Sequence, residues 1–307
     1  RDLARKKRLI KDYGKGSVKA LKGEEKTKEK SGIVNISEWC GRLGNNIHQL
    51  AQAYLLAEKH GWKVCYPHQD YFLPNDLSDY MHFLSKWHLR PIICADEPLF
   101  STEDFNRDYF KITENDRRRI CKDKINNLIR IPSYDVPEDV IVFHIRTGDV
   151  FRPDAHPGFL QPPLAFYISV IEKESIEDLS KVWVVTDSEE PENPVIDELR
   201  QMGCKILMEN VPLSIAALAN AKTGGMCKSS FSQMSFYFSD KIKKIYCPDY
   251  VYEEDGLGAI TDINVCKVNL PGYIKNGTWE ASDSQLETMI KYDIEKITIE
   301  EGVNHSN

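Results

Sequence analysis

The sequence predicts an α/β fold with two Rossmann-like domains facing a cleft. Short β-branched runs alternate with helical patterns of about ten residues, which is typical of parallel sheets covered by helices on both faces. This alternation occurs twice, before and after a charged segment that is interrupted by Pro132 and Pro137. A chain of 307 residues with 41% hydrophobic content is long enough for two such domains.

We expect the chain to divide into four segments. They are a basic linker or stem (1–30), an N-terminal α/β domain (31–136), a C-terminal α/β domain (137–270), and a C-terminal helix and tail (271–307). The last helix is predicted where Ser282 and Gln285, spaced as a capping box, precede an apolar stripe.

Charge is unevenly distributed along the chain, whose formal net charge is −7. Residues 1–30 hold twelve Lys or Arg against five Asp or Glu, a net charge of +7, so residues 31–307 carry −14. An acidic body argues against nucleic acid as a partner, because binding to the phosphate backbone needs a broad basic face. The basic arm is most simply a solvated linker, and the other interpretation is a docking arm for an anionic surface.

Targeting signals are absent from the sequence as given. No apolar run approaches the roughly 18 residues of a membrane span, and no signal-peptide pattern occurs. The eight cysteines are scattered singly, without metal-ligand spacing, so we expect buried thiols and a reducing, cytoplasmic compartment. The chain begins with Arg, so we expect it to be cut from a longer product, and a Golgi lumen is the alternative if a membrane anchor precedes residue 1.

An amphipathic helix is predicted directly after a glycine-rich turn. The stretch "CGRLGNNIHQLAQAYLLAEKHG" places apolar residues with helical periodicity after Gly41 and Gly44, and Gly61 ends the pattern. A β-branched run precedes it and another follows, which makes a βαβ unit. The loop that leaves the first strand then opens at the carboxyl edge of the sheet, where helix N–H groups attract anions.

Two groups that can carry positive charge come together at the end of a second predicted strand, "VIVFHIRTGDVF". Strand alternation places His144 and Arg146 on one face, and Gly148 ends the strand. A buried structural histidine is the simpler interpretation for His144, and an ion pair with Asp149 is the simpler one for Arg146. Its position beside a glycine at a strand end favours a functional role for Arg146.

Polar residues also follow two other predicted strands. "VWVVTDSEE" places Asp187 and Ser188 after one strand, and "CKSSFSQMSFYF" places Ser229, Ser230 and Ser232 at a helix start. Hydroxyls and free helix N–H groups form a phosphate-binding corner that needs no metal. N-capping explains any one of these serines, but not all three.

Four motifs in this order resemble the GDP-fucose fucosyltransferase superfamily, which includes α-1,2-, core α-1,6- and protein O-fucosyltransferases. They are G-R-L-G-N (41–45), H-I-R-T-G-D (144–149), V-V-T-D-S (184–188) and C-K-S-S-F-S (227–232). The resemblance implies a GT-B-type glycosyltransferase that transfers L-fucose from GDP-fucose to a glycan hydroxyl with inversion and without a metal or other cofactor. It also implies that the C-terminal domain holds the donor, and the N-terminal domain a glycan or glycoprotein acceptor.

The resemblance also implies roles for individual residues. The donor-binding set comprises His144, Arg146, Asp187, Ser188, Ser229, Ser230 and Ser232. The loop expected to close the site comprises Arg42, Gly44, Asn45 and His48. Thr147 stands where many members have a second arginine, so another nucleotide sugar remains an alternative donor.

In the expected chemistry, negative charge grows on the leaving phosphate, and Arg146 stabilises it. Removing such a donor typically costs about 2.7–4 kcal/mol. Candidates for the base that takes the acceptor proton are Glu38, Asp149, Asp154 and His48, of which we favour Asp149 and Glu38 as catalytic residues beside Arg146. The competing hypothesis is a protein that binds carbohydrate or nucleotide sugar without turnover.

Overall fold

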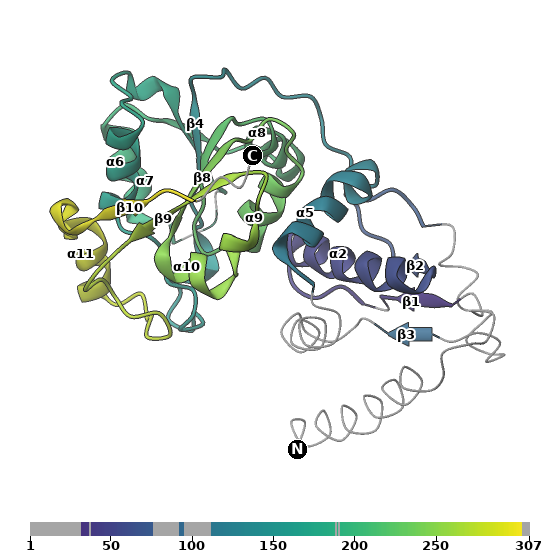
Figure 1. The fold of residues 1–307 in the computed structure, drawn as a ribbon. Helices are drawn as coiled ribbons and strands as arrows, with labels where there is room; N and C mark the ends of the chain where they lie inside the picture. The colour runs from purple at the N-terminus through teal and green to yellow at the C-terminus, as the bar shows by residue number, and fades with distance from the viewer. Residues whose placement is uncertain are drawn as a thin grey trace, which may run out of the picture.

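The computed structural model describes residues 32–36, 38–75, 92–94, 112–187, 189 and 191–302, with the backbone alone for 92–94. The strands form two sheets, one of three strands in the order β2-β1-β3 and one of seven in the order β10-β9-β8-β7-β4-β5-β6. Figure 1 shows the larger sheet on the left and the smaller one on the right. The predicted α/β class with mostly parallel strands is therefore confirmed.

The smaller sheet is built from the predicted βαβ unit. Its strands are β1 (Ile33–Asn35), β2 (Lys63–Cys65) and β3 (Ile92–Cys94), all parallel. Helix α2 (Leu43–His60) connects the first two strands and ends where Gly61 adopts a left-handed conformation, with φ at 64°. Only glycine enters that conformation without steric cost, which explains the sharp stop.

The larger sheet contains six parallel strands and one antiparallel edge strand. They are β4 (Ile141–His144), β5 (Val182–Val185), β6 (Lys205–Leu207), β7 (Thr223–Gly225), β8 (Lys244–Pro248), β9 (Asn264–Asn269) and β10 (Thr298–Glu300). The chain builds outward from β4 to β6 and then returns to place β7 on the other side of β4. The strand order therefore reverses between β4 and β7.

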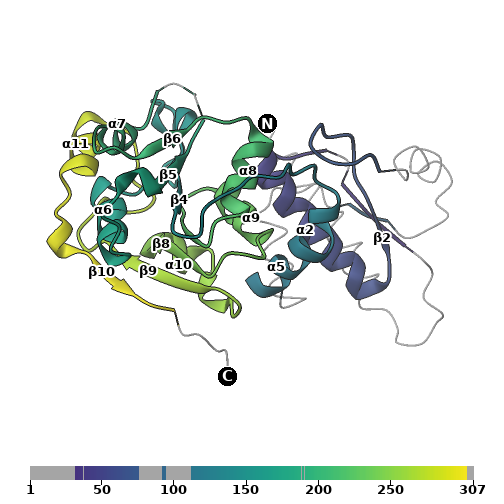
Figure 2. The same ribbon diagram turned by 90° about the horizontal axis from the view of Figure 1, so that it is seen from above.

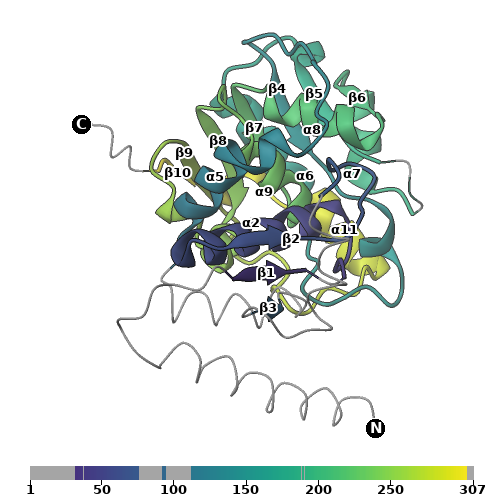
Figure 3. The same ribbon diagram turned by 90° about the vertical axis from the view of Figure 1, so that its right-hand side faces the viewer.

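Strand alternation in β4 separates two hydrophobic clusters. Ile141 and Phe143 belong to one cluster together with residues of α6 (Leu164–Lys173), α7 (Pro194–Gln201) and α11 (Asp283–Lys291). Val142 faces the other cluster, which includes residues of α2, α5 (Glu114–Asp123), α8 (Val211–Ala219) and α9 (Ser230–Tyr237). Figures 2 and 3 show these last four helices between the two sheets.

Short helices complete the described chain. Helix α10 (Asp249–Glu254) follows β8. The 3₁₀ turns are Ile125–Asn127, Gly148–Phe151, Leu179–Lys181, Leu257–Ala259 and Ile294–Lys296.

The charged run that begins at Glu114 starts with helix α5, which buries one face, including three of its charged residues (Glu114, Arg117 and Arg118). Glu114 accepts hydrogen bonds from Tyr237 (2.6 Å) and Gln233 (3.2 Å) of α9, and it pairs with Arg117. The Arg118 guanidinium donates to the backbone carbonyls of Phe236 and Ser239 at the end of α9, and each hydrogen bond is 3.1 Å long. These charges are paired across the two halves of the chain, so they can be buried there.

The C-terminal segment differs from its prediction in two ways. The expected helix forms, but Ser282 makes no side-chain cap and its hydroxyl contacts that of Ser284, while the Gln285 side chain bonds Thr278 and Glu280. The capping-box prediction is therefore wrong. After the helix, β10 pairs with β9 and so extends the sheet. The basic arm (1–30) lies outside the described residues, and the domain boundaries remain predictions.

The thiol prediction is confirmed for the described cysteines. Cys65, Cys121, Cys204, Cys227, Cys247 and Cys266 are free and buried, and Cys40 is free and half-buried. Among the described residues, no helix is long and apolar enough to cross a membrane.

Candidate functional site

The candidate site lies where the strand order of the larger sheet reverses. In open parallel sheets, ligands bind outside the carboxyl ends of the strands at such a switch point, because the chain departs to opposite sides there and leaves a crevice. Arg146 follows β4, and Ser229 and Ser230 follow β7. The sequence motifs therefore meet at the carboxyl edge of the larger sheet, beside the switch point.

Arg146 is held in place by three different contacts. Its Nη2 lies 2.8 Å from Asp149 Oδ2, and its guanidinium carbon lies 4.5 Å from the centre of the Phe159 ring. The Arg146 backbone carbonyl accepts a hydrogen bond from Asn193 Nδ2 (3.2 Å). The side-chain Oδ1 of Asn193 caps α7 by accepting the Val195 N–H. The guanidinium is 19% exposed, so it is preorganised and still accessible to a ligand.

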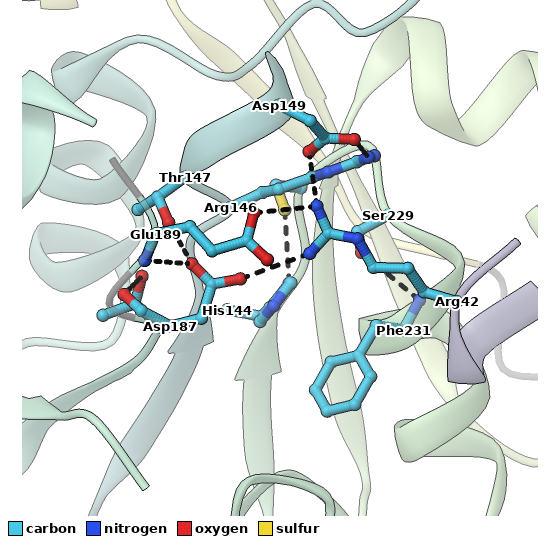
Figure 4. A network of polar contacts seen from close by, with 11 residues as sticks. Arg42, His144, Arg146, Thr147, Asp149, Asp187, Glu189, Ser229 and Phe231 are labelled. Carbon is cyan, nitrogen blue, oxygen red and sulfur yellow. Dashed lines mark hydrogen bonds and ion pairs between the residues drawn. The ribbon is translucent and has the colours of Figure 1, made fainter. Parts of the chain in front are cut away.

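Arg42 reaches this edge from the opposite half of the chain (Figure 4). Its Nη2 lies 2.9 Å from Asp149 Oδ1 and 3.0 Å from Glu189 Oε2, and its Nη1 lies 3.6 Å from Asp187 Oδ2. The contact with Asp149 is an ion pair without hydrogen-bond geometry, so the buried Oδ1 accepts no hydrogen bond from the described residues. Arg42 is 53% exposed, so these pairs are weak and can exchange.

The loop after β4 is fixed by a glycine and a threonine. Gly148 has φ at 67°, its N–H donates to Pro191 (2.9 Å), and a Cβ there would lie 2.4 Å from Glu189 Oε2. Thr147 is fully buried and donates its hydroxyl to Asp187 Oδ1, which also accepts the Glu189 N–H (3.3 Å). The Thr147 hydroxyl thus orients a carboxylate, and Oδ2 of Asp187 points to Arg42.

Two buried amides of α2 hold the glycine-rich loop. Gln49 Oε1 accepts the Cys40 N–H (3.2 Å), and its Nε2 donates to the Glu38 carbonyl (3.1 Å). Asn46 Nδ2 donates to the Cys40 carbonyl (3.1 Å), while Gly41 turns the chain with φ at 70°. These side chains satisfy backbone N–H and C=O groups of the loop that have no backbone partner among the described residues, so they fix the loop that carries Arg42.

The N-termini of α2 and α9 meet at the site. A Cβ on Gly44 would lie 2.5 Å from the backbone nitrogen of Phe231, so only glycine allows this approach. Ser230 Oγ donates to Asn45 Oδ1 over 2.5 Å and links the two helix starts. Both helices present free N–H groups and the positive ends of their dipoles here, an arrangement that favours an anion.

The other two serines have local structural roles. Ser229 is the N-cap of α9 and accepts the Phe231 N–H (3.2 Å). Ser232 is fully buried and donates back to the Ser229 carbonyl (3.1 Å). All three hydroxyls are therefore engaged within the protein, and the feature of this corner that favours an anion is the helix start.

His144 lies behind the two arginines and is 7% exposed. Its Nδ1 is 3.3 Å from Cys227 Sγ, and its ring centre is 5.3 Å from that of Phe231. Burial lowers the pKa of His144 to about 4, with Asp187 raising it and Arg146 lowering it to smaller extents. The imidazole is neutral at physiological pH, so it adds no charge to the site.

Four other predicted residues lie elsewhere or remain open. His48 is buried, and desolvation together with the charge of Arg117 on α5 lowers its pKa. Asp154 and Glu38 are exposed, and the Glu38 carboxylate makes no ion pair with the described residues. Ser188 lies outside the described residues.

Six residues of the site were not predicted from the sequence: Asn46, Gln49, Phe159, Asn193, Glu189 and Cys227. Glu189 and Cys227 lie inside the sequence stretches quoted above, which shows that they are near the predicted site. The sequence has no signal for the side chain that each of them contacts. Gln49 and Asn193 act through backbone hydrogen bonds, which residue patterns do not reveal.

The site as a whole carries three carboxylates and two guanidiniums, so its net charge is negative despite its anion-binding geometry. Among the described residues, no group of three or more His, Cys, Asp or Glu side chains is arranged to hold a metal ion. A cavity of about 440 Å³ lies at the opposite end of the sheet, lined by the first residues of β4 and β7 and by acidic side chains, and so is separate from this site.

Comparison with known proteins gives no family assignment. No family model matches the chain, and no curated protein matches it. Crystal structures of POFUT1 in complex with GDP and with GDP-fucose are 10% identical to this chain, with TM-scores of 0.35 and 0.36, and each comparison covers 72% of this chain and 99% of the other. The apo form of POFUT1 has a TM-score of 0.32 at 11% identity, covering 70% of this chain and 96% of the other. At this level of similarity they define no activity for this chain.

Proposed function

We propose that the protein is an inverting, metal-independent glycosyltransferase that transfers L-fucose from GDP-fucose to a glycan hydroxyl. One observation carries the proposal: Arg42 and Arg146, from opposite halves of the chain, approach the two oxygens of Asp149 at the switch point of the sheet. Two cations beside two helix N-termini suit a diphosphate, and three of the four motifs that resemble fucosyltransferases supply these residues and helix starts.

In the proposed reaction, the bond between the anomeric carbon and the β-phosphate oxygen breaks while the acceptor oxygen bonds to the opposite face of that carbon. Negative charge grows on the leaving nucleoside diphosphate. Arg146 meets that charge from a fixed position, because Asp149, Phe159 and Asn193 orient it before the ligand arrives. Preorganised donors of this kind stabilise the transition state without any cost of reorganisation.

The acidic residues around Arg42 are compatible with an anionic donor if Arg42 changes partner. In the proposed binding step, Arg42 leaves the carboxylates and pairs with the diphosphate, which offers more charge and a bidentate geometry. Asp149 Oδ1, which accepts no hydrogen bond from the described residues, then becomes available to the acceptor hydroxyl. We therefore favour Asp149 as the base that takes the acceptor proton, with the exposed Glu38 as the second candidate.

The nucleoside is assigned to Asp187. Its side chain is 44% exposed, and Thr147 and the Glu189 N–H hold Oδ1, so Oδ2 can accept hydrogen bonds from a ligand. Guanine offers adjacent N–H donors that match a carboxylate, and uracil and thymine offer fewer. In this proposal the larger sheet and its helices form the donor domain of a GT-B-type enzyme, and the half that carries Arg42 forms the acceptor side.

Thermal unfolding with a panel of nucleotides tests the donor assignment. GDP at about 100 times its Kd should stabilise the fold by roughly 2.7 kcal/mol. UDP and TDP at the same concentration should have smaller effects. Stabilisation by UDP or TDP without stabilisation by GDP would reject GDP-fucose as the donor.

Transfer from another nucleotide sugar is the second candidate function. Thr147 favours this alternative, because many fucosyltransferases have a second arginine at that position. Here the buried Thr147 hydroxyl donates to Asp187 and supplies no charge to the phosphate site. Under this alternative the same reaction occurs with a different deoxy-sugar or pentose donor. A binding protein without turnover would show nucleotide binding but no release of the free nucleotide from its sugar conjugate.

A further inference from the structure

The contact between His144 and Cys227 joins the carboxyl ends of the two strands that flank the switch point. His144 is the last residue of β4, and Cys227 follows β7 by two residues. Cys227 is fully buried, its Sγ lies 3.3 Å from His144 Nδ1, and the Phe231 ring centre lies 5.3 Å from that of the imidazole. A thiol at this distance is within hydrogen-bonding range of a ring nitrogen.

Both partners are uncharged at neutral pH. Burial lowers the pKa of His144 to about 4 and raises the pKa of the Cys227 thiol to about 12. The charged groups that act on both are Asp187 and Arg146, and neither outweighs burial. The pair is therefore an imidazole beside a protonated thiol, which lacks the thiolate that a nucleophilic cysteine needs.

The surroundings of the sulfur decide the direction of the hydrogen bond. The backbone N–H groups of Arg146 and of Cys227 itself face the sulfur and lower the pKa of the thiol against the larger effect of burial, so the sulfur lone pairs are directed toward donors. Its own S–H is then free to donate to His144 Nδ1. A neutral imidazole carries one proton, and an Nδ1 that accepts a hydrogen bond leaves that proton on Nε2, on the opposite side of the ring.

We propose that Cys227 is a positioning residue that holds His144 as the Nε2–H tautomer, so that His144 donates a hydrogen bond to an oxygen of the bound nucleotide sugar and takes no proton from the acceptor. The inference deepens the proposed function and rests on it, because it needs a ligand at the β4 and β7 ends. It gives the buried histidine a defined role and leaves the acceptor proton to Asp149 or Glu38.

Nitrogen NMR of the ligand-free protein tests the tautomer directly. The His144 signals, assigned by their loss in His144→Gln, should show a protonated Nε2 and an unprotonated Nδ1 at pH 7. Cys227→Ser keeps a donor and should preserve this state, and Cys227→Ala should give a mixture of tautomers. Cys204→Ala removes a buried thiol from the cluster that contains Ile141 and Phe143 and should change nothing. A protonated Nδ1 in the wild type would overturn the role of Cys227.

GDP affinity tests the role of the Nε2–H group. A glutamine amide can place an N–H near the position of Nε2, and an asparagine amide only near that of Nδ1. His144→Gln should therefore retain GDP affinity within about threefold, and His144→Asn should lose about tenfold, the scale of one hydrogen bond. Equal affinities would reject His144 as a donor to the ligand. If the wild type does not bind GDP, the proposed function fails, while the NMR tautomer still decides the role of Cys227.

Discussion

Arg42 Nη2 lies 2.9 Å from Asp149 Oδ1, and this ion pair connects the part of the chain with the smaller sheet to the part with the larger sheet. Arg42 belongs to the loop before α2, and Asp149 follows the first strand of the larger sheet. The second oxygen of Asp149 pairs with Arg146 over 2.8 Å. This carboxylate thus lies between two guanidiniums, and in the proposed binding step Arg42 leaves it for the diphosphate while Arg146 keeps its contact.

Replacing Arg146 should reduce turnover far more than stability. Arg146→Ala should lower kcat/KM by about a hundredfold or more, because one preorganised donor to the leaving phosphate is lost. Arg146→Lys should restore only part of this, since an ammonium lacks the bidentate fork. Steady-state kinetics together with thermal unfolding measure both effects. A variant that unfolds while its folded fraction stays active would make Arg146 a structural partner of Asp149.

Removing the charge of Glu189 should strengthen nucleotide binding. Glu189 is 42% exposed and competes with the ligand for Arg42, so Glu189→Gln should lower the Kd for GDP by about two- to fivefold, the scale of an exposed ion pair. Titration calorimetry measures the change. Asp197→Asn is the matched control, because it removes an equal charge that pairs with Arg200 on α7. Weaker binding by Glu189→Gln would show that Glu189 contacts the donor and does not compete with it.

Enlarging Gly44 should separate the two helix N-termini. Ala is the better helix former by about 1 kcal/mol, but its Cβ would lie 2.5 Å from the Phe231 backbone nitrogen, and such overpacking typically costs about 1–3 kcal/mol. Gly44→Ala should therefore lower both the melting temperature and kcat/KM, measured by calorimetry and by steady-state kinetics. A higher melting temperature with unchanged activity would contradict the close approach of α2 and α9.

The pH dependence of stability should report the buried His144. Its pKa is about 4 in the folded state and about 6.5 in the unfolded state, so between these values only the unfolded state binds the proton. Stability is therefore lost as the pH falls from 6.5 to 4, by roughly 3 kcal/mol for this group. Urea unfolding across this range should show a smaller loss for His144→Gln than for the wild type, because other titrating groups are common to both. Equal losses would mean that His144 is not buried as the neutral form.

Much of the fold could be predicted because its strands are apolar and its helices have one buried stripe. The run that forms α5 could not, because Glu114 and Arg118 are charged, and a sequence pattern assigns charged residues to solvent. Both are paired with groups of α9 that lie more than a hundred residues away in the chain. Strand β10 has three residues and depends on its pairing with β9, which no local pattern reveals.

The candidate site shows the same limit. Arg42, Arg146 and Asp187 could be predicted because strand ends and glycine turns mark the edge where they meet. The ion pair of Arg146 with Asp149 could also be anticipated, and the structure contains it. The pairs of Arg42 with Asp149 and Glu189 could not, because these residues lie more than a hundred positions from Arg42 in the chain. The serines Ser229 and Ser232 have the residue type of a phosphate site, but local backbone geometry uses their hydroxyls within α9.

The release of GDP from GDP-fucose in the presence of EDTA, with and without glycan acceptors, tests the central claim most directly. We expect wild-type protein to release GDP, and to form a fucosylated product with a suitable acceptor, at a rate that EDTA does not change. Arg146→Ala should lose at least about 99% of that rate, as expected for one lost transition-state donor. A strict requirement for Mn²⁺ or Mg²⁺, or equal rates for wild type and Arg146→Ala, would contradict the account.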